Sequence, residues 1–288
     1  MELLLIGGST LILSVCTVLN KFYTNTTLGI KNANAIFLIL SHPIAIILFF
    51  ILAKGNVPIN LTTLIYVVIY AIICLSTVLF TLISFNKTNL IAISVFTGAG
   101  GVILPFIIES IFSISTFSIY QIFSVVFRLI AVCLPFIFIK SRKKGLIYCI
   151  ILFFISGAAV LLVKFYNITA NTVSDNSFCF WTNVFILPAS IVLLLFSSKP
   201  KEIIKDAKSI RLSSYLILIG FTLLNNLCTL MTLIAMNYVS ATIFSVLQSA
   251  GAFVLTSIAS ATVFKEKLTK IEFFSLAFSI ISVVFGLL

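Results

Sequence analysis

Long apolar stretches separated by short polar segments run along the whole chain. Breaks at charged residues, proline or asparagine predict ten helices, near residues 3–20, 34–53, 62–85, 90–112, 117–139, 146–165, 178–197, 213–236, 238–264 and 271–288. A membrane-spanning helix needs about 20 apolar residues, so ten of them use roughly 200 positions and leave about 88 for loops and ends. The junctions at Asn86–Asn89 and at Asn237 are very short, so a count one lower or higher stays open.

Composition agrees with this pattern and argues against a soluble globular protein. Hydrophobic residues make up 61% of the chain and charged residues 9%, with a mean hydropathy of +1.28. Soluble domains carry about 25% charged residues, which cover their water-facing surface. Seven acids and 18 bases among 288 residues cannot provide such a surface. The sequence therefore predicts an all-α polytopic membrane protein, in the plasma or inner membrane.

The basic residues fall almost entirely on one side of the predicted membrane. The loops after the first, third, fifth, seventh and ninth helices hold 15 of the 18 bases, and the loops on the other side hold only Lys54 and Lys164. Cytoplasmic loops of membrane proteins are enriched in Lys and Arg, so this bias predicts that both termini lie outside. The net charge of +11 is then explained by topology, and nucleic acid is not an expected partner.

Cysteine and histidine usage argues against a metal or redox centre. The six cysteines are scattered through apolar segments with no C-x-x-C spacing, and His42 is the only histidine. We interpret the cysteines as small apolar side chains that fill space. No cofactor is expected.

The chain contains an internal repeat. The segment 94–104 (SVFTGAGGVIL) aligns with 245–255 (SVLQSAGAFVL) at a separation of 151 residues, and at the same separation Asn86 aligns with Asn237 and Phe127 with Phe278. Lys21-Phe22-Tyr23 and Lys164-Phe165-Tyr166, which we expect to end two equivalent helices, are 143 residues apart. Loops of different length explain the change in separation. The sequence thus predicts a first five-helix repeat over 1–139, a basic linker over 140–145 and a second five-helix repeat over 146–288.

A repeat of five helices enters the membrane in the opposite orientation the second time, because five is odd. Inverted repeats of this kind are typical of secondary transporters, whose substrate site lies between the two halves near the middle of the membrane. The two halves can exchange slightly different conformations, which opens the site to one side and then the other. This pattern favours transport by alternating access.

With this repeat in view, the chain resembles the drug/metabolite transporter superfamily, in particular its ten-helix EamA-type members. The resemblance lies in the five-plus-five layout and in the final stretch, where a small-residue helix is followed by Phe264-Lys265-Glu266-Lys267-Leu268-Thr269 and a last apolar helix. The first repeat has Ser115-Thr116-Phe117-Ser118-Ile119 in place of the glutamate turn. The resemblance implies termini inside the cell, opposite to the charge bias, so both orientations stay open.

The repeated segment supplies the first candidate substrate contacts. Small residues recur every fourth position in both copies, which lets two central helices cross closely. Thr97 and Gln248 are equivalent across the repeat and are expected to face a shared central cavity, with Ser249 beside Gln248. A glutamine side chain both donates and accepts hydrogen bonds and is costly when it faces lipid. Gln248 is therefore the leading candidate for a substrate contact.

Further polar residues lie within predicted spans. Asn225 and Asn226 are adjacent and point about 100° apart, so we expect one to line the cavity and the other to join helices. His42 precedes Pro43, which interrupts helical hydrogen bonding. A structural hydrogen bond, a proton relay and a substrate contact all remain open for His42.

Arg128 lies near the centre of the fifth helix, where an unpaired charge costs about 2.5 to 3.5 kcal/mol. Three interpretations stay open for Arg128: a structural pair with Glu109, an anion site, or contact with lipid headgroups. Glu109 is the only acid well inside a span. This scarcity of carboxylates favours uniport or exchange over proton antiport.

These observations favour a secondary transporter for a small organic solute such as an amino acid, metabolite or drug-like compound. A flippase for a lipid-linked carrier is the alternative, and a lateral opening to the bilayer would distinguish it. An intramembrane enzyme is disfavoured because H-E-x-x-H, G-x-S-x-G and paired-acid motifs are missing. The mostly neutral polar candidates suggest neutral or zwitterionic cargo, and a homodimer stays open.

Overall fold

The computed structural model describes residues 2–85, 90–138, 143–169, 173–197, 199–265 and 269–288. The secondary structure in these ranges is entirely α-helical, as predicted. The eleven helices are α1 (Glu2–Thr26), α2 (Ala33–Leu52), α3 (Leu61–Phe85), α4 (Leu90–Ile111), α5 (Ile119–Phe138), α6 (Lys143–Thr169), α7 (Asp175–Ser197), α8 (Pro200–Ser209), α9 (Leu212–Ala235), α10 (Ala241–Thr262) and α11 (Lys270–Leu287).

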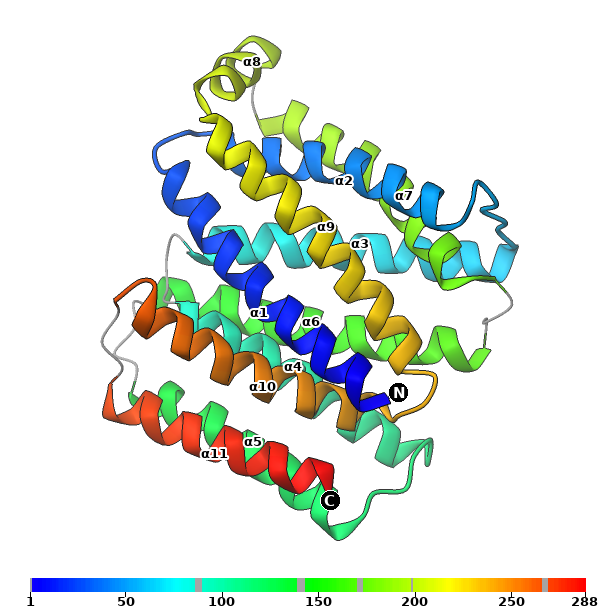
Figure 1. Cartoon of the computed structure of the whole chain (residues 1–288), viewed down its shortest axis with the longest axis vertical. Coiled ribbons are helices and arrows are strands. Elements are labelled where there is room, and N and C mark those ends of the chain that lie inside the picture. The colour runs from blue at the N-terminus through cyan, green and yellow to red at the C-terminus, as the bar shows by residue number, and fades with distance from the viewer. Residues whose placement is uncertain (1, 86–89, 139–142, 170–172, 198, 266–268) are drawn as a thin grey trace.

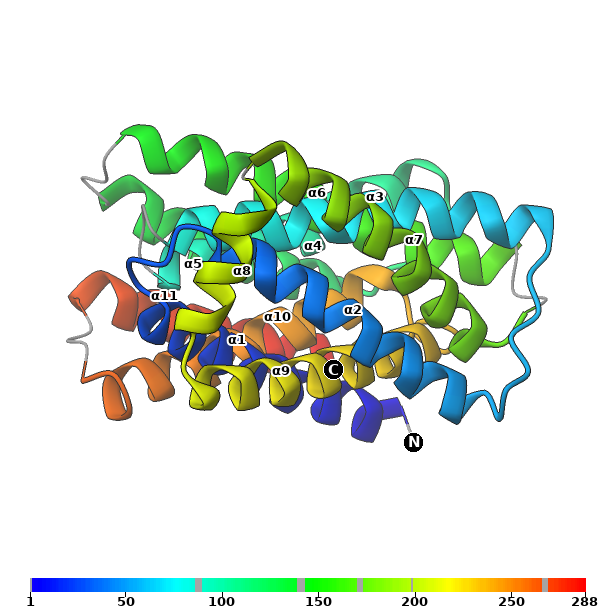
Figure 2. The same ribbon diagram turned by 90° about the horizontal axis from the view of Figure 1, so that it is seen from above.

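The helices other than α8 lie side by side across the bundle (Figures 1 and 2). The helix α1 packs against α9 and α10, and α6 packs against α3 and α4. The pairs α2 with α7, α4 with α10 and α5 with α11 also pack together. The short helix α8 stands at one corner of the bundle.

Six of the described helices are long and apolar enough to cross a membrane: α1, α2, most of α3, most of α6, α9 and α10. The helices α4, α5 and α11 contribute shorter apolar stretches. Large apolar side chains such as Leu4, Ile72 and Phe273 are exposed on the outside of the bundle. Exposed apolar surface of this extent requires lipid around it.

Local hydrogen bonds explain where several helices begin. Ser118 and Gln121 cap α5 reciprocally, because Ser118 N donates to Gln121 Oε1 at 3.1 Å and Gln121 N donates to Ser118 Oγ at 3.2 Å. Ser240 caps α10 by accepting from Ile243 N at 3.2 Å. Asn60 caps α3 in the same manner.

Several predicted helix ends were wrong. The helix α1 continues to Thr26 and α6 to Thr169, so the two Lys-Phe-Tyr motifs lie inside their helices rather than at the ends. The helix α8 was missed because its sequence PKEIIKDAKS is too polar for the apolar pattern. Its Asp206 carboxylate accepts from Asn32 N at 3.2 Å and Asn32 Nδ2 at 2.8 Å, which fixes α8 to the α1–α2 connection. The Asn86–Asn89 junction and linker residues 140–142 lie outside the described residues.

Glycines allow the central helices to approach closely. A Cβ at Gly100 of α4 would overlap the carbonyl of Phe153 on α6, and a Cβ at Gly157 would meet the backbone of Gly100 in return. A Cβ at Gly98 would lie 3.1 Å from that of Ser249, which confirms the predicted close crossing of α4 and α10. Such contacts replace the hydrophobic effect as a packing force within lipid.

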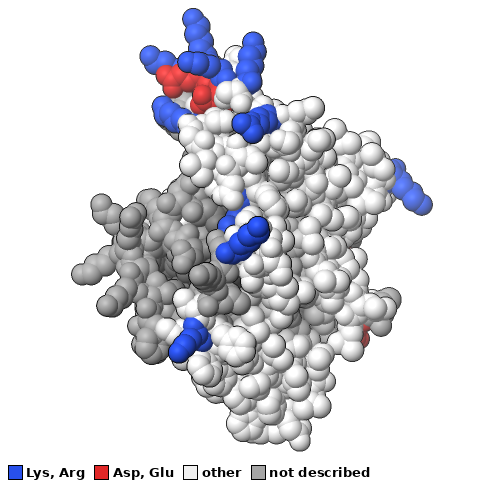
Figure 3. Space-filling view, turned by 60° about the vertical axis from the view of Figure 1, so that its left-hand side comes forward, with Lys and Arg blue, Asp and Glu red and all other residues white. Residues whose placement is uncertain are grey.

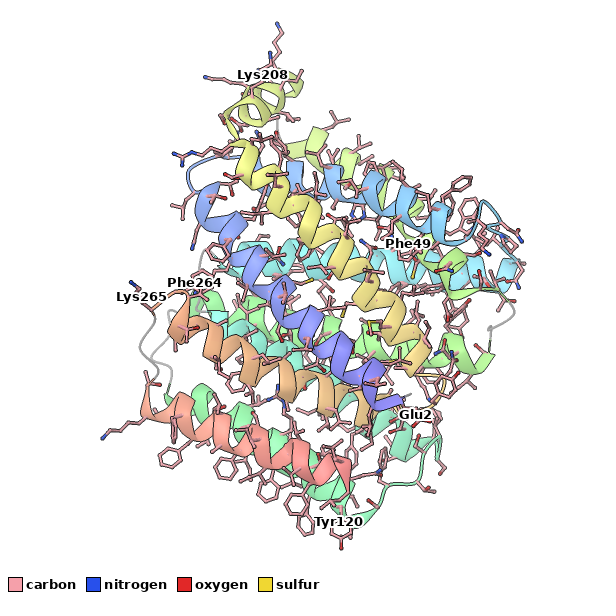
Figure 4. The ribbon with its side chains drawn as sticks, in the orientation of Figure 1. Glu2, Phe49, Tyr120, Lys208, Phe264 and Lys265 are labelled. Carbon is pink, nitrogen blue, oxygen red and sulfur yellow. The ribbon has the colours of Figure 1, made fainter. Side chains whose placement is uncertain are left out.

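The two ends of the bundle differ in charge. We call the end where α1 finishes and α8 lies the basic end, and the end where Glu2 and Leu287 lie the terminal end. Lysines and arginines gather over α8 at the basic end (Figure 3). Lys208 and Lys265 mark this end, and Glu2 and Tyr120 mark the other (Figure 4). Because successive helices run in alternate directions, the connections that carry most of the described Lys and Arg residues meet at the basic end, as the sequence predicted.

The α4–α6 contact predicts opposite effects for two glycine substitutions. Gly100→Ala should destabilise the protein by about 1–3 kcal/mol, because the Phe153 carbonyl belongs to a rigid helix and cannot move away. Gly220→Ala on α9 should be neutral or stabilising by up to about 1 kcal/mol, since a Cβ there meets nothing within 4 Å. Thermal unfolding of both variants in detergent measures the difference. Equal melting temperatures would contradict the close contact.

Candidate functional site

A cavity of about 300 Å³ lies at the centre of the bundle, among α1, α3, α4, α6, α9 and α10. We call it the main cavity. Its apolar wall includes Phe221 and Phe253. The polar residues that line it are Thr17, Asn20, Thr77, Thr81, Thr97, Ser156, Asn225, Ser245, Gln248, Ser249 and Thr256.

The structure places Thr97, Gln248, Ser249 and Asn225 on the wall of the main cavity. Thr97 lies on α4 and Gln248 on α10. Gln248 Nε2 makes only long contacts, 3.5 Å to Thr232 Oγ1 and 3.9 Å to a cysteine sulfur, so its amide remains available to a solute. Four of the seven predicted site residues therefore share one cavity.

Asn225 and Asn226 differ in the main cavity, which only Asn225 lines, and both line a smaller cavity. Asn225 lines the main cavity and also a second cavity of about 70 Å³ between α2, α3, α7 and α9, which we call the side chamber. Asn226 joins helices: its Nδ2 donates to Thr222 O at 2.8 Å, and its Oδ1 accepts from Asn183 Nδ2 on α7 at 3.2 Å. His42 lies in the side chamber with its Nδ1 2.8 Å from Asn183 Oδ1.

Arg128 lines neither cavity, and of the three interpretations left open for it, the pair with Glu109 is not formed. Its guanidinium is 1% exposed and donates to Ser279 Oγ at 2.9 Å and to Ser249 O at 3.2 Å. One guanidinium nitrogen lies so close to Gly98 that a Cβ there would clash with it. Arg128 thus sits directly behind the α4–α10 crossing that forms the cavity wall. Neither lipid nor a headgroup can reach it there.

Glu109 joins α4 to the start of α10 at the terminal end of the bundle. Its carboxylate, 0% exposed, accepts from Ala241 N at 2.9 Å, Thr242 N at 3.0 Å and Thr242 Oγ1 at 2.6 Å. These are the first groups of α10, where the helix dipole favours a negative charge. The carboxylate therefore anchors α4 to the start of α10.

Lys164 of α6 complements Glu109 on the other side of the same turn. Its Nζ donates to Met236 O at 3.0 Å and to Val239 O at 2.9 Å, at the end of α9. A cation at a helix C-terminus is favourable because the last carbonyls lack partners. One available signal was overlooked in the sequence, since Lys164 is one of only two bases on the base-poor side.

The main cavity lies near the middle of the spans, and the terminal end is tightly packed. The cavity residues of α3 lie in its half nearer the basic end, whereas Ser245, Gln248 and Ser249 lie in the half of α10 nearer the terminal end. The terminal end is closed by a buried cluster in which Tyr166 and Phe178 lie 4.3 Å apart between ring centroids and Phe49 is fully buried (Figure 4). This conformation has its cavity on one side of a closed barrier.

The chemistry of the main cavity is neutral and rich in hydrogen-bond acceptors. The hydroxyls of Thr17 and Thr77 donate to carbonyls of the preceding helical turn, which leaves their lone pairs to accept. Asn20 Oδ1, Ser245 Oγ and Ser249 Oγ are buried without a partner. No charged side chain lines this cavity among the described residues. The described His, Cys, Asp and Glu side chains form no group of three that could hold a metal.

Comparison with known proteins identifies the family. The family model described as "EamA-like transporter family" matches residues 143–288, about half of the chain. The chain belongs to the EamA-like transporter family. This EamA-like protein is therefore a multi-pass membrane transporter of the drug/metabolite type.

Solved structures agree with this fold. One, titled "Crystal structure of protein", superposes on the EamA-like protein with a TM-score of 0.66 over 96% of both chains at 13% identity. An identity this low shows a shared fold only. No curated protein matches the chain.

The anchoring role of Glu109 predicts a charge-dependent contribution to stability. Glu109→Gln keeps the side-chain shape but removes the charge that faces three donors, and should cost about 1.5–3 kcal/mol. The control Glu2→Gln changes an exposed glutamate at the same end of the bundle and should leave stability unchanged. Thermal unfolding in detergent measures both variants. A Glu109→Gln protein as stable as wild type would contradict the assignment.

Proposed function

We propose that this EamA-like transporter carries a small organic solute by alternating access between two inverted five-helix repeats, with ten membrane spans and α8 as an insertion in the second repeat. The observation that carries the proposal is a neutral cavity at the crossing of α4 and α10 with a packed barrier on one side. A carrier in one of its two end states has this arrangement.

The helix boundaries support the repeat. The helices α3 and α5 begin at Leu61 and Ile119, and α9 and α11 begin 151 residues later, at Leu212 and Lys270. The packing has the same symmetry. With α1 equivalent to α6, the contacts of α1 with α9 and α10 correspond to those of α6 with α3 and α4.

Single contacts support the repeat as well. The Gly100 approach to Phe153 corresponds to that of Gly251 to Thr10, where an added Cβ would lie 2.7 Å from the Thr10 methyl group. Arg128 donates to Ser279, its own equivalent at a separation of 151. Contacts between equivalent residues mark a two-fold axis, because only residues near such an axis can touch their own partners.

A second reciprocal contact joins α5 and α11. Ser124 Oγ donates to Ser282 O at 2.6 Å, and Ser275 Oγ donates to the carbonyl of Ala131. Ser275 is equivalent to Ser124, and Ser282 to Ala131, so the two bonds exchange under the same operation. We infer that α5 and α11 form the fixed part of the molecule and that α4 and α10 move near the axis.

The transport cycle then opens the terminal end. Opening would separate the start of α10 from Glu109 and the end of α9 from Lys164, the two contacts that hold this turn. By the positive-inside rule the basic end is cytoplasmic, which places the termini outside a plasma or inner membrane. The cavity lacks carboxylates among the residues described, which supports uniport or exchange.

Reconstitution into proteoliposomes tests the proposal. Labelled amino acids and metabolites should enter without a pH gradient, and preloading with unlabelled solute should accelerate uptake, because a carrier returns faster when occupied. Gln248→Ala should lower kcat/KM about 2- to 10-fold through loss of one or two hydrogen bonds. The control is Gln121→Ala, the only other glutamine, which caps α5 outside the cavity.

Two results would contradict the proposal. Equal flux through the Gln248→Ala and Gln121→Ala variants would show that Gln248 does not contact the solute. A preparation that moves no solute but scrambles fluorescent lipid-linked carriers would instead identify a flippase.

A further inference from the structure

The side chamber is smaller than the main cavity, and hydrogen bonds fix the orientation of several of its polar side chains. It measures about 70 Å³, against about 300 Å³ for the main cavity. Val78, Phe221 and Asn225 line both cavities and therefore form the partition between them. A volume of this size holds about two water molecules, at about 30 Å³ each. The chamber can thus accept a single chemical group but not a whole solute.

Two asparagine amides in the chamber have a fixed orientation. Asn226 Nδ2 lies 2.8 Å from Thr222 O, and Asn183 Nδ2 lies 2.9 Å from Cys179 O. A carbonyl oxygen can only accept, so both amide nitrogens must point toward these carbonyls. Asn183 Nδ2 also donates to Asn226 Oδ1 at 3.2 Å, which leaves Asn183 Oδ1 directed at His42.

This chain of amides determines the tautomer of His42. Asn183 Oδ1 is an acceptor, and it lies 2.8 Å from His42 Nδ1, so Nδ1 carries the proton. In the neutral imidazole the other nitrogen, Nε2, then has a free lone pair. His42 is only 9% exposed, and Nε2 is buried without a hydrogen-bond partner. A buried acceptor without a partner lowers the stability of the folded protein unless a ligand or water supplies a hydrogen-bond donor.

The hydroxyl groups of the chamber are acceptors for the same reason. Ser41, Thr182 and Thr229 each donate to a backbone carbonyl of their own helix, at 2.9, 2.8 and 3.0 Å. Their protons are therefore committed, and only lone pairs remain to face the chamber. Among the described lining residues, the Asn225 amide and the second N–H of Asn226 offer donors without an assigned partner, and the Tyr70 hydroxyl is hydrogen-bonded to Cys74. Lone pairs repel a carboxylate or phosphate.

We propose that the side chamber is a subsite for a hydrogen-bond donor group of the transported solute, a hydroxyl or an amine, which donates to His42 Nε2 while the rest of the solute occupies the main cavity. This inference rests on the proposed transport function and narrows its substrate class. The solute carries an O–H or N–H group at one end and an apolar body that packs against Phe221. Asn225 links the two sites because it lines both cavities.

The first test is the tautomer of the free protein. His42 is the only histidine, so tag-free protein labelled with 15N-histidine in nanodiscs gives one imidazole signal pair. We expect a pyrrole-like Nδ1 and a pyridine-like Nε2 in wild type. Asn183→Leu removes the acceptor for Nδ1 and should shift the ring toward the Nε2–H form. A wild-type ring protonated at Nε2 alone would overturn the proposal without any mutation.

The second test uses matched probes that differ in a single donor. We expect 2-phenylethanol or phenethylammonium to move the Nε2 resonance, whereas the methyl ether of the first and the N,N,N-trimethyl form of the second should not. His42→Phe should weaken binding of the active probe about tenfold, as expected for one lost hydrogen bond. A response to the hydroxyl alone or the ammonium alone identifies which donor the chamber prefers and supports the proposal.

Two outcomes would overturn it: no Nε2 response to either donor probe, or equal responses to a donor and its methylated control. These spectra require no transport. A protein that shows the predicted tautomer and probe response but no solute flux would therefore disprove the transport proposal while the donor subsite stands. Flux through a protein without the Nε2 response would disprove only the subsite.

Discussion

The structure depends on one constraint: in a hydrocarbon solvent, every polar group needs a partner within the protein. Hydroxyls meet it by donating to carbonyls of their own helix, as Thr77 and Thr229 do. Among the described residues, nine buried polar atoms do not meet it, and four of these belong to cavity residues: Asn20 Oδ1, Ser245 Oγ, Ser249 Oγ and His42 Nε2. At the cavities, a solute can supply the missing partner.

The buried charges follow the same constraint in a different manner. Glu109 and Lys164 are each satisfied mainly by backbone groups at the two sides of the α9–α10 turn. Arg128 is held by a serine hydroxyl and a backbone carbonyl behind the cavity wall. Backbone groups at helix ends thus supply most partners of Glu109 and Lys164, and the attraction between these two charges adds to them. Arg128 has its own partners on α10 and α11, so the alternative in which it pairs with Glu109 is not observed.

The cavity residues show how far sequence reasoning reached. Thr97 and Gln248 were found because the repeat makes them equivalent, and the pattern also separated Asn225 from Asn226 by their angular positions. Asn183, which orients His42, was overlooked because a single asparagine in an apolar helix has no periodic signal. The pair is 141 residues apart, and only the packing of α2 against α7 brings it together.

The sequence by itself determined the solvent, the helical class and the separation of charge between the two ends. These properties follow from composition and from local periodicity, which do not depend on distant contacts. Tertiary structure decided the partners of Arg128 and Glu109, the shape of the two cavities and the tautomer of His42. Each of these depends on which helices cross and at which residue, such as α4 and α10 at Gly98 and Ser249. That geometry comes from the packing of all the helices together, and no single segment of the sequence contains it.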